Sequence, residues 1–87
     1  MIKTKMTARD MVGKRYKFIK PLRLGNCKMK VGDVIQILDY GAGMASYYVG
    51  FKCDRLPSWK FQYADWALLR NVEEIKEYIG GEYETEI

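Results

Sequence analysis

Apolar and polar residues alternate along several short stretches of this chain, and this period is typical of half-buried β-strands. In the first stretch Tyr16 and Phe18 fall on one face, while Arg15 and Lys17 fall on the other. The predicted strands cover residues 14–20, 27–31, 34–40, 47–53 and 59–63. The third is almost continuously apolar, which favours a central position in the sheet. Loops and turns rich in Gly, Asn, Asp, Pro and Ser are expected between the strands at 22–26, 32–33, 41–46 and 54–58.

The hydrophobic period becomes helical near both ends of the chain. Residues 7–10 weakly match a capping box, which predicts one helical turn over residues 7–13, ended by Gly13. Near the other end, four apolar residues recur at the spacing of one helical face: Leu68, Val72, Ile75 and Ile79. They predict an amphipathic helix over residues 71–80, which packs on the sheet or, in the alternative, docks a partner.

One run of this pattern resembles part of a known fold. Residues 27–38, CKMKVGDVIQIL, carry the apolar-x-x-Gly-Asp-x-apolar-x-apolar pattern of the central hairpin in Src-homology-3-like small barrels. The hairpin with Tyr47 and Tyr48 and a short turn at residues 63–66 follow in the usual order, so the resemblance covers about residues 13–69. It implies a fold and no particular function, because the Ala-Leu-Tyr-Asp-Tyr opening of the proline-rich-peptide binders is absent.

The expected fold class is therefore mainly β, a small Src-homology-3-like five-stranded barrel with a short N-terminal helical turn and a C-terminal amphipathic helix. A chain of 87 residues buries only one modest core, so we expect a single domain over residues 1–87. Its parts are the helical turn at 7–13, the barrel at 14–70, the helix at 71–80 and an acidic tail at 81–87.

Charge is sorted along the chain. Residues 1–30 carry ten Lys or Arg against the single Asp10, a net charge of +9. Residues 31–70 are neutral, and residues 71–87 carry six Glu against Lys76, a net charge of −5. A basic block opposite an acidic block indicates a polyanionic partner, a self-complementary assembly, or both.

The basic block predicts a binding face for nucleic acid or a nucleoprotein. Its candidate contacts are Lys14, Arg15, Lys17, Lys20, Arg23, Lys28 and Lys30, which would form one patch if their strands are neighbours. The aromatic residues that could stack on unpaired bases, or serve in an interface, are Tyr16, Tyr47, Tyr48 and Trp59. The alternative is that the basic residues only keep a small sheet soluble while the aromatic residues fill its core.

Two other readings involve protein partners. The chain is similar in size and simplicity to the small accessory proteins of phages and mobile elements, some of which inhibit host defence complexes such as CRISPR effectors by binding a protein. Candidate interface residues for such binding are Arg55 and Tyr78. Glu82, Glu84 and Glu86 recur at the period of a strand, so the tail could instead add to a sheet edge and hold a homodimer together. A homo-oligomeric structural or adaptor role is the remaining alternative.

Catalysis is not expected, because the chain has no histidine and no nucleophile-elbow, phosphate-loop or dinucleotide-binding motif. Cys27 and Cys53 do not have the spacing of a metal site and are interpreted as small apolar side chains in a reducing compartment. We therefore expect no cofactor and no metal. No apolar run reaches the roughly 18 residues of a membrane helix, and residues 1–6 lack the apolar stretch of a signal peptide. A cytoplasmic location without membrane contact is expected.

Overall fold

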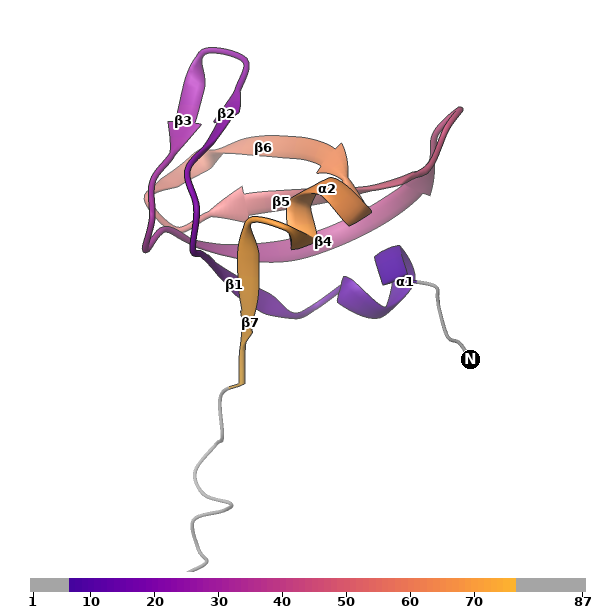
Figure 1. The fold of residues 1–87 in the computed structure, drawn as a ribbon, viewed down its shortest axis with the longest axis horizontal. Helices are drawn as coiled ribbons and strands as arrows, with labels where there is room; N and C mark the ends of the chain where they lie inside the picture. The colour runs from indigo at the N-terminus through magenta and orange to yellow at the C-terminus, as the bar shows by residue number, and fades with distance from the viewer. Residues whose placement is uncertain (1–6, 77–87) are drawn as a thin grey trace, which may run out of the picture.

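The computed structural model describes residues 7–76, in which most of the chain forms antiparallel strands (Figure 1). In chain order the elements are α1 (Thr7–Met11), β1 (Arg15–Phe18), β2 (Leu22–Leu24), β3 (Cys27–Met29), β4 (Val34–Ala42), β5 (Tyr47–Cys53), β6 (Leu56–Ala64), α2 (Asp65–Leu69) and β7 (Val72–Ile75). Five strands form the main sheet in the order β6-β5-β4-β1-β7, and β2 and β3 form a separate hairpin. The prediction of a mainly β fold with a short N-terminal helical turn is confirmed.

One face of the main sheet forms the core, because alternate residues on its strands are apolar. The residues of the main sheet with at most 1% of their surface exposed are Phe18, Ile35, Ile37, Val49, Phe51 and Cys53. The two helices contact each other and add Ala8, Met11 and Leu68 to the same buried cluster. Helix α1 ends just before Gly13, whose N–H donates a hydrogen bond to the carbonyl of Ile37 at 2.8 Å. The helical turn predicted over residues 7–13 is thereby joined to the centre of the sheet.

A bulge in β4 turns its second half away from the core. Ile37 pairs with Phe51, but the next pair along the strands is Asp39 with Gly50, so Leu38 is an extra residue on β4. The carboxylate of Asp39 accepts a hydrogen bond from Lys60 Nζ at 2.6 Å. These two side chains pass over Gly50, where a Cβ would overlap both of them. A glycine at this position therefore gives the ion pair room to cross strand β5.

The β2–β3 hairpin projects from the main sheet (Figure 1). The sequence predicted a loop over residues 22–26, but Leu22 pairs with Met29 and Leu24 with Cys27. The strand Leu22–Leu24 alternates over only three residues and follows Pro21. For these two reasons the sequence pattern predicts a loop here instead of a strand. The run that resembles a central hairpin also differs from expectation, because β3 pairs with β2 while β4 pairs with β1 and β5.

The helix predicted over residues 71–80 is wrong, because Val72–Ile75 is a β-strand that pairs with β1. Val72 lies opposite Phe18 and is 5% exposed. On the same pair of strands, Lys17 lies opposite Glu73, and the two side chains approach to 3.5 Å. Tertiary pairing with the open edge of β1 thus overrides a helical spacing of apolar residues. The rest of the predicted helix, residues 77–80, and the acidic tail at 81–87 lie outside the described residues.

The predicted closure into a barrel is not observed. Within residues 7–76 the strands β6 and β7 form the two edges of the main sheet, and no pairing joins them. The other predicted strands are confirmed, with β6 extended toward its start to include Leu56 and Pro57. Neither helix in this part of the chain has the length and apolar composition needed to cross a membrane.

Candidate nucleic-acid interface

The seven basic residues predicted to contact nucleic acid lie in two separate places. The first group, Lys14, Arg15 and Lys17, lies on β1 or directly before it, and the second group, Lys20, Arg23, Lys28 and Lys30, lies on the β2–β3 hairpin or directly beside it. β1 has β4 and β7 as its neighbours, whereas β2 pairs with β3. The two groups therefore do not share a sheet, and the neighbouring strands on which the single patch depended are not found.

The basic residues of the β1 group face carboxylates. Lys14 Nζ lies 4.0 Å from Glu74 Oε2 on β7, next to the contact between Lys17 and Glu73. Arg15 Nη2 donates a hydrogen bond to Asp54 Oδ2 at 2.7 Å. The basic and acidic blocks of the sequence thus meet in space where β1 and β7 pair. The carboxylates of these exposed ion pairs therefore offset most of the positive charge of the first group.

The second group, which we call the basic hairpin, consists of Lys20, Arg23, Lys28 and Lys30. Arg23 lies directly opposite Lys28 across the β2–β3 ladder, and both side chains are exposed. No Asp or Glu occurs between residues 11 and 32, and none of these four cations forms an ion pair with a carboxylate among residues 7–76. The nearest carboxyl is that of Asp33, whose pKa the charge of Lys30 helps to lower. Like charges opposite each other on a sheet repel. An anion bound between them would remove this repulsion.

Arg55 connects the base of the basic hairpin to the main sheet. Its guanidinium donates from Nε to Asp33 Oδ1 at 3.0 Å and from Nη2 to Asp33 Oδ2 at 2.8 Å. Nη2 also donates to the carbonyl of Lys28 at 3.1 Å, and Asp33 Oδ2 accepts the backbone N–H of Lys30 at 2.8 Å. The hydrogen bonds from Arg55 lower the pKa of Asp33 and raise the pKa of Arg55 itself. The predicted interface residue Arg55 is therefore hydrogen-bonded to other residues of the chain. The sequence predicted a turn at Asp33 but not its ion pair with Arg55.

The four candidate aromatic residues differ in exposure. Tyr16 is only 4% exposed and belongs to the core, so it has no free face on which a base could stack. Tyr48 is half-buried, with its ring over Gly41. Tyr47 is 46% exposed on β5 and Trp59 is 60% exposed on β6. None of the four lies on the basic hairpin, so the structure does not combine cations and stacking rings on one element.

The environment of Tyr16 also changes its acidity. Burial raises the pKa of its hydroxyl to about 12, and the negative charges of Glu74 and Asp10 act in the same direction. The hydroxyl therefore stays protonated throughout the physiological range. Tyr16 acts as a core residue whose polar end faces acidic neighbours on β7 and α1.

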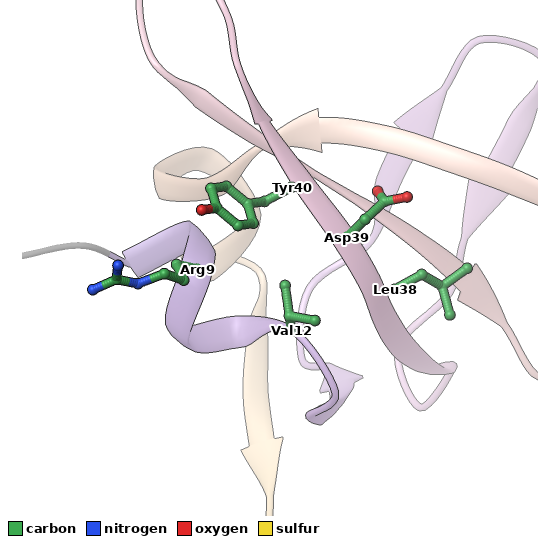
Figure 2. A pocket seen from close by; sticks show the side chains of 5 residues that line it. All are labelled: Arg9, Val12, Leu38, Asp39 and Tyr40. Atoms are coloured by element: carbon green, nitrogen blue, oxygen red, sulfur yellow. The ribbon is translucent and has the colours of Figure 1, made fainter.

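A surface depression of about 420 Å³ lies between α1 and β4, away from the basic hairpin (Figure 2). Val12, Leu38 and Tyr40 provide its apolar lining, with 39%, 39% and 43% of their surfaces exposed. Figure 2 shows Arg9 pointing outward at its rim. The ring of Tyr47 meets that of Tyr40 edge-on, with 6.2 Å between the ring centroids. No pattern in the sequence indicates this surface, because it forms only where the bulge at Leu38 shifts the register of β4.

The remaining predicted interface residues, Tyr78, Glu82, Glu84 and Glu86, lie outside the described residues. Of the two cysteines, Cys53 is buried in the core and Cys27 is half-buried on β3. No cluster of three metal-ligating side chains occurs within residues 7–76. Comparison of the chain with protein-family models, curated proteins and solved structures finds no match.

Proposed function

We propose that this protein is a non-enzymatic binding protein that contacts nucleic acid, alone or within a nucleoprotein complex, through the basic hairpin. The observation that carries the proposal is the distribution of ion pairs. The cations of β1 form ion pairs with carboxylates, whereas none of the four cations of the basic hairpin forms an ion pair among residues 7–76, although the charge of Lys30 helps to lower the pKa of Asp33. A phosphate backbone would supply the missing anions and release condensed counterions on binding.

The proposed surface is smaller than the one expected from the sequence. We no longer propose the three cations of the β1 group as nucleic-acid contacts, because Lys14, Arg15 and Lys17 each form an ion pair with a carboxylate. Tyr16 is no longer proposed as a residue on which a base stacks, because its ring is buried. Arg55 becomes a positioning residue, since its bonds to Asp33 and to the carbonyl of Lys28 fix the base of the hairpin.

We further propose that the fold is an open variant of the small barrel that the sequence resembles. Five strands share one sheet, and the first of them, β1, lies beside the last, β7. The short helix α2 begins at Asp65, within the turn that the resemblance places at residues 63–66. Within residues 7–76 the edges of β6 and β7 do not pair with each other, which distinguishes this arrangement from a closed barrel.

The salt dependence of binding tests which cations are used. Fluorescence anisotropy of labelled nucleic acid would be measured with purified full-length protein over a salt series. For duplex DNA, four phosphate contacts predict a slope of about −3.6 in log K against log salt, or roughly a 150-fold loss of affinity between 50 and 200 mM. Seven contacts predict a slope of about −6.3 and roughly a 6,000-fold loss.

Two matched double variants locate the surface. Arg23→Gln with Lys28→Gln removes two charges from the basic hairpin, and Lys14→Gln with Lys17→Gln removes two from the β1 group. We expect the first pair to flatten the slope by about 1.8 and the second pair to leave it nearly unchanged, because only the first loses phosphate contacts. Circular dichroism checks that both variants are folded. An equal effect of both pairs, or no binding at low salt, would refute the proposal.

A second candidate function is protein binding at the depression between α1 and β4. The observation that favours it is the group of partly exposed apolar side chains of Val12, Leu38 and Tyr40 around one hollow, with the cationic Arg9 at the rim. Asp39 also lines the hollow, but its carboxylate is held by Lys60 Nζ at 2.6 Å. The lining therefore fits a partner that presents an apolar side chain next to a carboxylate for Arg9. The salt series separates the two candidates, because a protein that uses only this surface would not bind bare nucleic acid through the basic hairpin.

A further inference from the structure

The two faces of the β2–β3 hairpin are chemically distinct. On one face Leu22, Leu24 and Met29 pack against the core cluster, and Met29 is fully buried. On the other face Arg23 and Lys28 are exposed opposite each other, and strand alternation places Lys30 on the same side as Lys28. The apolar face anchors the hairpin to the protein, so the cationic face is presented outward on a supported ribbon.

The tip of this ribbon is narrow. Gly25 occupies the turn with φ +61°, a conformation that favours glycine, and Asn26 follows it with an exposed amide side chain. The turn therefore carries no bulky side chain at the point farthest from the sheet (Figure 1). Two strands about 4.8 Å apart form a ribbon that enters the major groove of B-form DNA, which is about 12 Å wide.

The side chains on the ribbon also indicate which form of nucleic acid it fits. No aromatic residue occurs between residues 19 and 32, so the ribbon offers no ring on which an unpaired base could stack. Asn26 belongs to a residue type that makes paired hydrogen bonds to adenine edges in the major groove. The deep, narrow major groove of A-form RNA does not admit such a ribbon.

We infer that the β2–β3 hairpin inserts into the major groove of double-stranded DNA, with Asn26 at the tip toward the base edges and with Lys20, Arg23, Lys28 and Lys30 near the phosphates that border the groove. This inference rests on the proposed function and deepens it, since it names the class of nucleic acid. It also assigns Asn26, for which the sequence predicts only a turn, to the contact surface.

The test compares four labelled probes of the same sequence and length at one salt concentration. They are duplex DNA, duplex RNA, single-stranded DNA, and duplex DNA whose cytosines carry a glucosylated hydroxymethyl group at C5. That group fills the major groove and leaves the phosphates unchanged. We expect unmodified duplex DNA to bind at least about tenfold more tightly than the other three, which is the size of one good base-edge contact.

The outcomes separate this inference from the proposed function. Equal affinity for the modified and unmodified DNA duplexes, or for duplex RNA and duplex DNA, overturns the groove insertion. If that binding still falls in the Arg23→Gln, Lys28→Gln variant, the basic hairpin remains the nucleic-acid surface and only the groove assignment is lost. If the variant binds every probe as the wild type does, both proposals fail.

Discussion

Alkaline pH should destabilise this protein through Tyr16. Because the side chain is buried at 4% exposure, the phenolate form is disfavoured and the pKa of Tyr16 rises to about 12 from an ordinary value of 10.0. A group whose pKa is raised by folding contributes stability that is complete below the ordinary pKa and is lost as pH rises through the folded one. The loss should therefore begin near pH 10 and be complete above pH 12.

The size of the effect follows from the shift in the pKa of Tyr16. A difference of about two units corresponds to a total loss of about 3 kcal/mol in the free energy of unfolding, of which about 1 kcal/mol is lost by pH 11. With a urea dependence of about 1 kcal/mol per molar for a small domain, the unfolding midpoint at pH 11 would fall by roughly 1 M. Such a change is well above the error of the measurement.

The assay is urea unfolding at about pH 9 and about pH 11, followed by circular dichroism, for the wild type, Tyr16→Phe and Tyr47→Phe. Apart from Tyr16 and Tyr47, all three proteins contain the same ionisable side chains. The wild type and Tyr47→Phe should show the extra loss of about 1 kcal/mol at the higher pH, because Tyr47 is 46% exposed, whereas Tyr16→Phe should not. If Tyr16→Phe loses as much stability between the two pH values as the wild type does, the explanation by burial of the Tyr16 hydroxyl is refuted.

Two further changes test contacts that fix the sheet and the hairpin. Asp33→Asn should cost about 1 kcal/mol near pH 7, a figure kept small because Arg55 is 41% exposed. The pKa of Asp33 is lowered by folding, so this stabilisation is present above its ordinary value of 3.8 and is lost as pH falls below it; thermal unfolding curves of variant and wild type should converge in acid. Gly41→Ala should lower the free energy of unfolding in urea by about 1–3 kcal/mol, because its Cβ would lie 2.5 Å from the Oη of Tyr48. The same loss in a Tyr48→Ala background would contradict this cause.

The fold could be predicted from the sequence wherever a strand carries its own alternating pattern. The strands β1, β4 and β5 each alternate, or are apolar, over four or more residues, and local sequence is enough to place them. β2 has only three residues, so its pairing with β3 provides most of the evidence for it. In β7 the spacing of Val72 and Ile75 fits one face of a helix, whereas in a strand the two residues lie on opposite faces. Pairing with β1, which lies far away in the sequence, determines that this segment forms a strand.

The same limit applies to the candidate site. Composition and charge correctly place the basic residues at the surface, because a sheet with one buried face leaves alternate positions in water. Which cations already have partners depends on the pairing of Lys17 with Glu73 and of Arg15 with Asp54, and these contacts join residues more than thirty positions apart. The sequence therefore predicts a basic face, and the tertiary contacts select the part of it that is left for a ligand.

The pairing of β1 with β7 also has a consequence for how the chain folds. Phe18 cannot meet Val72 until 54 further residues have been made, so β1 has one open edge during most of its synthesis. Closing such a long loop costs entropy, and an open strand edge is a site for wrong pairing with other chains. A ribosome-bound chain that stops before Val72 should therefore depend on chaperones, although most of its core residues are already present. Among the strands of residues 7–76, β7 then forms the edge, and Glu73 and Glu74 supply the charge that discourages further strands from adding.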